Sequence, residues 1–259
     1  MLTLAAGSNN NRGKTMKLHI LGCGDAFGSG GRLQSSYLVE ANYRLFLLDC
    51  GATALLAMKR AGFDPRRLDA IMISHLHGDH FGGLPFFLID YLYRQPKNDP
   101  LLIAGPPGTE SKVRQLFNLL YGSASDDKEL PMTIFQILHP DQPARVAGID
   151  VFPFPVPHQT QAISLALKVS YQGKQILFSG DSLWTESFLD QARGVDLFLC
   201  ECSFYREQPG MHVNYQALEA NLARLQCRRL ILTHLGEEML AHRYELAVQV
   251  AADGMVIEV

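Results

Sequence analysis

Three features are scarce in this sequence: cysteine, long hydrophobic runs and net charge. The 259 residues include five scattered cysteines, Cys23, Cys50, Cys200, Cys202 and Cys227. Their odd number argues against a disulfide framework and favours a reducing cytoplasm, and we interpret Cys200 and Cys202 as buried thiols of one strand rather than metal ligands. No apolar run reaches the ~18–20 residues of a membrane span. The net charge of -3 gives no general basic surface for nucleic acid, although a local patch would still be compatible with it.

Internal repeats, low-complexity tracts and long Pro/Ser linkers are also missing, which favours a single domain. The 47% apolar composition supports a substantial core. The first residues, MLTLAAGSNNNRGKT, lack the apolar core and cleavage pattern of a secretion signal. We therefore expect residues 1–15 to be a flexible extension and residues 16–259 to form the domain.

Apolar patterning predicts short strands interleaved with helices. We expect strands at residues 17–21, 36–40, 44–49, 70–73, 101–104, 133–137, 150–156, 163–170 and 175–179, and helices at 52–61, 84–94 and 109–120. Three further strand-and-helix steps are expected at 185–200, 214–232 and 240–259. Extended runs near both ends, with helices between them, favour an α/β fold in which two packed sheets carry helices on their outer faces.

Potential metal ligands are concentrated in the stretch AIMISHLHGDHFGGLP. Three of the nine histidines and one aspartate fall within six positions, as His75, His77, Asp79 and His80. On a helix the first two would lie about 200° apart, so we expect a strand-to-helix loop instead. Such a loop can aim His75 and His77 at one point, and Asp79 and His80 at a second point nearby. This predicts a site for two metal ions; a polar surface loop is the alternative.

Two metal ions need more ligands, and three candidates come shortly after apolar strands. His158 follows IDVFPFPVP, Asp181 ends QILFSGD and His234 ends RLILTH. Loops from one edge of a sheet converge on a common cleft, so these side chains could complete both coordination shells. Asp181 is the natural bridge, because its two oxygens can reach both ions. Taken singly, each of the three is more often a cap or a satisfied polar residue.

The motif HxHxDH resembles the signature of the metallo-β-lactamase superfamily of hydrolases, and the resemblance covers almost all of residues 16–259. It implies an αββα sandwich. It also implies that Asp49, in FLLDCG, orients a ligand histidine from the second shell, with a helix cap as the alternative. The ligand sets it implies are His75, His77 and His158 at the first metal and Asp79, His80 and His234 at the second, with Asp181 bridging.

Within the superfamily, SHLHGDHFGGLP, LLIAGPPG and GMHVNYQALEANLARL resemble the branch of RNase Z and cyclic phosphodiesterases. This resemblance implies that His212 is the proton donor and a catalytic residue together with Asp79, while Asn214 caps the following helix. RNase Z enzymes that trim transfer RNA usually insert a long arm between the lone His ligand and the bridging Asp. Here 22 residues separate His158 from Asp181. Transfer RNA is therefore not the expected partner, and a small-molecule phosphodiester is.

The expected activity is hydrolysis of a small or cyclic phosphodiester by a hydroxide between two divalent ions about 3.5–4 Å apart. Zinc is the expected metal, with manganese or iron as alternatives. Hydrolysis of a lactone or thioester, an RNase Z-like endoribonuclease without the arm and a non-catalytic metal-dependent binding module remain open. A redox diiron enzyme is disfavoured, because that branch usually carries Glu where this chain has His77.

Two further stretches bear on the site and on assembly. LGCGDAFGSGG resembles a dinucleotide-binding loop, but the third glycine of that motif would fall on Phe27, so a flexible loop bordering a site is expected. The apolar stretch LPFFLIDYLY, residues 84–93, is expected to lie in the core, because apolar helical stripes usually do. The face of a homodimer is the alternative.

Overall fold

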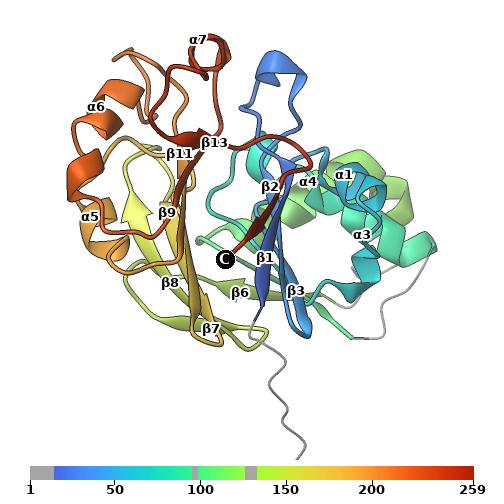
Figure 1. Ribbon diagram of the computed structural model, residues 1–259. Helices are drawn as coiled ribbons and strands as arrows, with labels where there is room; N and C mark the ends of the chain where they lie inside the picture. Colours follow the sequence, from blue (N-terminus) through green and yellow to red (C-terminus); the bar gives the residue numbers. More distant parts are fainter. Residues whose placement is uncertain (1–14, 95–98, 126–132) are drawn as a thin grey trace, which may run out of the picture.

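Two seven-stranded sheets pack face to face in this protein (Figure 1). The computed structural model describes residues 15–94, 99–125 and 133–259, without the side chains of 123–125. The expected extension, residues 1–15, thus lies almost entirely outside the described residues. The two sheets and their outer helices confirm the predicted αββα sandwich.

The first sheet is built mainly from the first half of the chain. Its strands, in spatial order, are β14 (Val256–Glu258), β1 (Met16–Gly22), β2 (Ser36–Ala41), β3 (Arg44–Leu48), β4 (Ala70–Met72), β5 (Leu101–Gly105) and β6 (Thr133–Ile137). The C-terminal strand β14 pairs antiparallel with β1, with Ile257 opposite Leu18. The last strand of the chain therefore completes the sheet that the first strand begins.

The second sheet comes from the second half of the chain. Its strands, in spatial order, are β13 (Gln249–Val250), β12 (Leu230–Thr233), β11 (Leu197–Glu201), β10 (Lys174–Phe178), β9 (Ser164–Tyr171), β8 (Ile149–Val156) and β7 (Ala144–Val146). The strands β10, β11 and β12 run parallel, and β8 has the direction of β10 because each is antiparallel to β9. The residues that follow β8, β10, β11 and β12 therefore emerge at one edge of the sheet.

Helices cover the outer face of each sheet (Figure 1). The first sheet carries α1 (Ala54–Arg60), α3 (Leu84–Tyr93) and α4 (Thr109–Ser125), and the second carries α5 (Ser187–Gln191), α6 (Tyr215–Glu219) and α7 (Glu237–Ala241). The remaining helical turns are α2 (Gly78–Phe81), η1 (Ser29–Gly31), η2 (Pro65–Arg67) and η3 (Leu222–Arg224). Leu84, Phe87, Leu88 and Tyr91 of α3 are buried, which confirms the core interpretation of residues 84–93.

Successive residues of the central strands face different layers. In β3, Phe46 and Leu48 pack between the two sheets, whereas Leu45 and Leu47 pack under the helices of the first sheet. Side chains of a strand alternate between its faces, so a strand covered on both faces must be apolar at every position. This explains the unbroken apolar run that ends β3.

The expectation for residues 240–259 was wrong in detail. The helix of that step, α7, begins at Glu237, and the two strands that follow it, β13 and β14, join different sheets. Local patterning indicates a strand but not its partner, because pairing is decided by contacts distant in sequence. The other two steps contain the expected helices and the strands β11 and β12.

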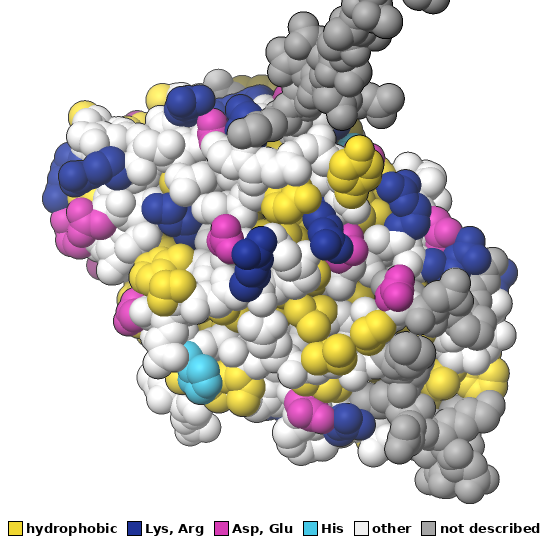
Figure 2. All heavy atoms as spheres, turned by 90° about the horizontal axis from the view of Figure 1, so that it is seen from below, with side chains coloured by type: hydrophobic (Ala, Val, Ile, Leu, Met, Phe, Trp, Pro, Cys, Tyr) yellow, Lys and Arg dark blue, Asp and Glu magenta, His cyan; other side chains and the backbone are white. Residues whose placement is uncertain are grey.

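Three general properties of the chain can be read from the structure. All five cysteines are free thiols. Among the described residues, no helix has both the length and the apolar character needed to cross a membrane. On the face seen from below, basic and acidic side chains are interspersed with scattered hydrophobic ones (Figure 2).

Candidate active site

The segment after β4 gathers four ligand-type side chains. His75 and His77 lie on a loop, whereas Asp79 and His80 lie on α2, a single helical turn. The prediction that all four lie on a loop was therefore wrong for the last two. The turn nevertheless keeps them together, with Asp79 Oδ2 3.2 Å from His80 Nε2.

His75, His77, His158 and Asp181 form a group that we call the first cluster. Nδ1 of His77 lies 3.2 Å from Nε2 of His75 and 3.0 Å from Nε2 of His158. Asp181 Oδ2 lies 3.7 Å from Nε2 of both His75 and His158. Ligand atoms at about 2.0–2.2 Å from one zinc ion must lie within about 4.4 Å of each other, and these distances meet that condition.

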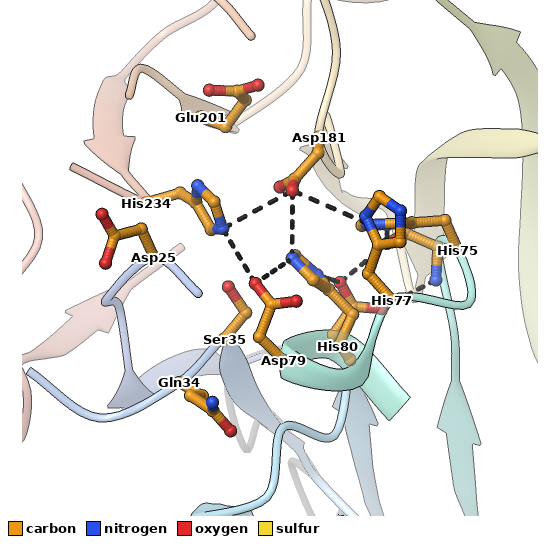
Figure 3. A network of polar contacts seen from close by, with 12 residues as sticks. Asp25, Gln34, Ser35, His75, His77, Asp79, His80, Asp181, Glu201 and His234 are labelled. Atoms are coloured by element: carbon orange, nitrogen blue, oxygen red, sulfur yellow. Dashed lines mark hydrogen bonds and ion pairs between the residues drawn. The ribbon is translucent and has the colours of Figure 1, made fainter. Parts of the chain in front are cut away.

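Asp79, His80, His234 and again Asp181 form the second cluster. Nε2 of His234 lies 3.3 Å from Asp79 Oδ2 and 3.5 Å from Asp181 Oδ2. The latter oxygen is also 3.2 Å from His80 Nε2. The structure thus brings together all seven ligand candidates, in two groups that meet at one carboxylate. In the close-up, Asp181 lies between His75 and His234 (Figure 3).

Asp181 joins the clusters through a single atom. Its Oδ2 approaches the histidines of both clusters, whereas we expected one oxygen to serve each ion. Asp181 also lies three residues beyond β10, one residue further than we expected for a strand end. Gly180, with φ 56°, supplies the left-handed backbone that turns the chain toward the clusters.

The donors present fit a pair of divalent cations. Nε2 of His80 is buried and makes no hydrogen bond of acceptable geometry among the described residues, although carboxylate oxygens of Asp79 and Asp181 lie 3.2 Å away. An unsatisfied buried nitrogen is destabilising, and a cation beside it would remove that penalty. Imidazole nitrogens and carboxylate oxygens are also the ligands that zinc and similar ions take in proteins.

Asp49 supports the second cluster from the end of β3. It accepts hydrogen bonds from Ser74 N, Ser74 Oγ and His80 Nδ1, each 2.7 Å long. These contacts fix the orientation of the His80 ring. The alternative reading of Asp49 as a helix cap was wrong, because Thr53 is the N-cap residue of α1. Asp49 and His234 both have positive φ, 56° and 57°, and such backbone strain is typical of functional sites.

The histidines divide into two electrostatic classes. Burial lowers the pKa of His75, His77 and His158, which favours the neutral imidazole that a metal requires. Burial also acts to lower the pKa of His80 and His234, but carboxylates, Asp181 first among them, outweigh it and raise the pKa of both. A bound cation would take the place of the protons on these two rings.

His212 reaches the site from the segment before α6. Its Nδ1 donates a 2.9 Å hydrogen bond to Glu201 Oε1, which leaves Nε2 free of that contact. Burial by itself would lower the pKa of His212, but the hydrogen bond and charge of Glu201 raise it to about 9. As predicted, Asn214 caps α6, because its side chain accepts a hydrogen bond from Ala217 N.

Glu201 is a site residue that our sequence analysis missed. One of its oxygens accepts from Ser182 N at 2.8 Å and the other from Ser203 N at 3.1 Å. Ser203 Oγ in turn lies 2.9 Å from His234 Nδ1, so Glu201 links the second cluster to His212. The alternation of the strand was the signal that could have found it. Cys200 and Cys202 pack under the outer helices, so Glu201, which lies between them, must face the opposite way, toward the other sheet.

A cavity of about 530 Å³ lies over the two clusters. Side chains of both clusters form part of its lining, among them His77, Asp79 and Asp181, and His212 lies beside them. The outer wall comes from the loop between β1 and η1, the segment after β11 and the start of α7. The prediction that the glycine-rich loop after β1 borders a site is confirmed. The expected flexibility of this loop was wrong, because the carboxylates of Asp25 and Glu237 accept hydrogen bonds from its backbone amides.

Comparison with known proteins assigns the chain to a family. The family model of the Anti-Pycsar protein Apyc1 matches residues 16–252. The chain belongs to this family. An uncharacterized protein of Mycobacterium tuberculosis is 28% identical over 228 residues, which is 85% of this chain and 81% of that protein. A ribonuclease Z of Mycolicibacterium paratuberculosis is 31% identical over 177 residues, or 65% of this chain and 63% of that enzyme.

A solved structure agrees with the fold. The metallo-β-lactamase fold protein YhfI of Bacillus subtilis superposes with a TM-score of 0.76 at 23% identity, over 95% of this chain and all of that one (100%). The chain therefore has the metallo-β-lactamase fold and is similar in sequence to a ribonuclease Z, and its two buried His/Asp clusters suit a binuclear metal site.

Proposed function

We propose that the protein hydrolyses small phosphodiesters, cyclic nucleotides in particular. The observation that carries the proposal is the position of His212, which is held by Glu201 beside the carboxylate that the two clusters share. Membership of the Apyc1 family supports it, because that family suggests a cyclic nucleotide phosphodiesterase.

The proposed ligands are the seven side chains of the two clusters, and zinc is the proposed metal. In the first cluster the ligand nitrogens are His75 Nε2, His77 Nδ1 and His158 Nε2. Met211 O accepts from His158 Nδ1 at 2.9 Å, which fixes that ring. When bound, two divalent cations at such a site polarise a phosphoryl oxygen and lower the pKa of water toward neutrality.

The chain itself supplies the proton for the leaving group. In the proposed reaction, water forms a new P–O bond, the P–O bond to the sugar oxygen breaks, and that oxygen takes a proton from His212 Nε2. Glu201 accepts a hydrogen bond from Nδ1, and its hydrogen bond and charge raise the pKa of His212 to about 9, so that at neutral pH the ring carries a proton on both nitrogens and Nε2 can donate. A linear diester gives a phosphomonoester and an alcohol, whereas a cyclic nucleotide gives a single nucleoside monophosphate. The water proton leaves to a nearby carboxylate, for which Asp79 is our candidate.

This arrangement is suited to a poor leaving group. A ribose alkoxide is strongly basic and needs a positioned acid, whose contribution is typically 10²–10⁴-fold. The side chain of His212 is 22% exposed and lines the cavity, so it can reach a bound substrate. Thioester hydrolysis gives no comparable reason for an acid held at this position, because a thiolate is a much weaker base than an alkoxide and departs without help.

The test is a hydrolysis screen of the metal-loaded protein. Its panel contains 3′,5′-cyclic nucleotides, linear phosphodiesters, phosphomonoesters, lactones, thioesters and precursor transfer RNA. We expect the highest kcat/KM on small or cyclic phosphodiesters and poor trimming of the precursor. Far higher specificity for the precursor, or for a lactone or thioester, would contradict the proposal. Asp181→Ala serves as the control for contaminating hydrolases, because it removes the shared ligand.

A further inference from the structure

The outer wall of the cavity is acidic. Apart from the two clusters and His212, its charged side chains are Asp25, Glu237 and Glu238. Carboxylates repel phosphate groups, so any phosphate beyond the one held at the clusters would be disfavoured. The cavity therefore suits a substrate with one phosphate and an otherwise uncharged body. Its volume of about 530 Å³ is within the range of small-molecule sites, roughly 300–1,000 Å³.

One large apolar side chain stands at this wall almost fully in solvent. Phe27 is 92% exposed, although its loop neighbours Asp25 and Ser29 are each 5% exposed. It lines the cavity together with Phe204, an aromatic side chain on the segment after β11. An exposed aromatic ring at the wall of a catalytic cavity offers a flat surface to a ligand.

The loop that carries Phe27 is firmly held. Asp25 Oδ1 accepts from Phe27 N at 3.1 Å and from Ser29 N at 2.9 Å. Glu237 Oε1 accepts from Gly30 N at 2.9 Å, which ties the loop to the start of α7. The ring is thus presented from an ordered backbone, so little conformational entropy would be lost when it contacts a ligand.

We propose that Phe27 is a specificity residue that stacks on the base of a cyclic nucleotide whose phosphate lies at the two clusters. The inference rests on the proposed phosphodiesterase function and adds the contact that selects the organic part of the substrate. Aromatic stacking tolerates any base, because every base presents a π-face. An uncharged aromatic contact also agrees with a wall whose carboxylates disfavour further phosphates.

The test variant is Phe27→Ala, and Phe27→Trp is its conservative partner. Phe204 is not used, because its ring packs edge to face on His212, with centroids 5.9 Å apart, and its loss would disturb the acid. Tyr43→Ala is the matched control: Tyr43 is 87% exposed, but it lies in the β2–β3 turn, and β2 runs away from the site toward that turn.

The experiment compares a 3′,5′-cyclic nucleotide with a base-free cyclic phosphate of 1-deoxyribose. We expect Phe27→Ala to raise KM for the nucleotide about tenfold with little change in kcat, and to raise KM for the base-free substrate far less. Phe27→Trp should restore the nucleotide KM, and Tyr43→Ala should match the wild type on both substrates. Equilibrium binding of a slowly hydrolysed cyclic phosphorothioate nucleotide should weaken by a similar factor in Phe27→Ala.

The outcomes separate this inference from the proposed function. An unchanged nucleotide KM, or an equal rise on both substrates, would overturn the role of Phe27 while leaving the phosphodiesterase intact. Wild-type protein that binds the phosphorothioate more tightly than Phe27→Ala, yet hydrolyses no diester, would support the contact and contradict the activity. Wild-type protein that neither binds nor hydrolyses cyclic nucleotides would overturn the inference.

Discussion

Replacement of His212 should lower the catalytic activity only when the substrate has a poor leaving group. A nitrophenolate departs without help, whereas an alkyl or ribose alkoxide needs the proton that His212 donates. We expect His212→Ala to keep both metals, to lose little activity on a nitrophenyl diester, and to lose on the order of 10²-fold or more on an alkyl or nucleotide diester. Steady-state kinetics on the two substrates, with metal analysis of the same samples, measure this.

Glu201→Gln provides the companion variant, because the amide keeps the shape of the side chain but removes the charge beside His212. Its activity should show the same dependence on leaving group in weaker form.

Two outcomes would contradict the role of His212. Equal losses of activity of His212→Ala on both substrates would indicate that His212 binds phosphate instead. Loss of metal from His212→Ala would make His212 a ligand or its support, and the role of proton donor would have to be abandoned.

Asp49 should act on metal affinity rather than on a proton transfer. It makes the hydrogen bond that orients the ring of His80, and removal of such a partner typically costs 10–100-fold in affinity. We therefore expect Asp49→Ala to weaken the binding of one metal per chain by about this factor. A competition titration against a chelator measures the affinity.

Asp69 supplies the control for Asp49. Asp69 also accepts hydrogen bonds, from Arg44 Nη1 and Leu45 N, both 2.8 Å long. It lies just before β4, whereas Asp49 lies just after the parallel strand β3, so the two carboxylates are at opposite ends of these strands. Asp69→Ala should lower the free energy of unfolding and leave metal affinity unchanged. A comparable loss of affinity in both variants would mean that Asp49 acts only through general stability.

At the scale of elements, the turn after β10 positions the shared carboxylate. Gly180 has φ 56°, and a Cβ there would lie 2.8 Å from Leu165 O and 2.9 Å from Ser74 Cβ. We expect Gly180→Ala to lower the free energy of unfolding by more than about 2 kcal/mol, because left-handed strain of about 1–2 kcal/mol adds to the close contacts. Chemical denaturation measures it, and metal binding should weaken as well.

A substitution at Gly194 separates the backbone strain from the close contacts of the added Cβ. Its φ is 75°, but a Cβ there would meet nothing within 4 Å among the described residues. Gly194→Ala should therefore show the backbone strain alone, about 1 kcal/mol, with metal binding intact. Equal effects of the two substitutions would mean that the packing against Leu165 and Ser74 is easily relieved.

The elements differ in how far the sequence could predict them. Strands such as β3, which is apolar at every position after Arg44, were predicted in existence and bounds to within a residue or so. The turn α2 was missed because four residues beginning with a glycine carry no periodic pattern. The sheets of β13 and β14 could not be assigned, because Ile257 pairs with Leu18 across almost the whole chain.

At the scale of the whole molecule, the site joins the two sheets. The ligand candidates after β4 belong to the first sheet, and those after β8, β10 and β12 belong to the second. We expect metal analysis of loaded protein to approach two equivalents per chain, because seven ligands exceed what one tetrahedral ion can use. His75→Ala and Asp181→Ala should both lower that value.

Metal should also raise the thermal stability, because it binds the assembled fold and not the unfolded chain. At a free concentration 100 times the Kd, the expected gain is about 2.7 kcal/mol, seen as a higher Tm in a calorimetric scan. Chelation should reverse it. A protein saturated by one metal with full activity, or a Tm that does not respond to chelation, would contradict the binuclear site.

The contiguous part of the site was the easiest to predict. His75, His77, Asp79 and His80 are adjacent in sequence, and three more candidates were found because polar residues just after buried strands converge at a sheet edge. Glu201 was missed because its partner depends on the path of the segment that follows β11. The use of one Asp181 oxygen by both clusters is set by side-chain rotamers, about which the sequence carries no signal.

The distribution of the ligands along the chain has a consequence for biosynthesis. His234 follows His75 by 159 residues, so it is made much later in translation. At about 5–20 residues per second, on the order of ten seconds or more of translation separate the two. The nascent chain on the ribosome thus carries exposed histidines long before it can close the second cluster. Complete metal loading must therefore wait until His234 has been made, and a competing cation captured earlier would be held by an incomplete set of ligands.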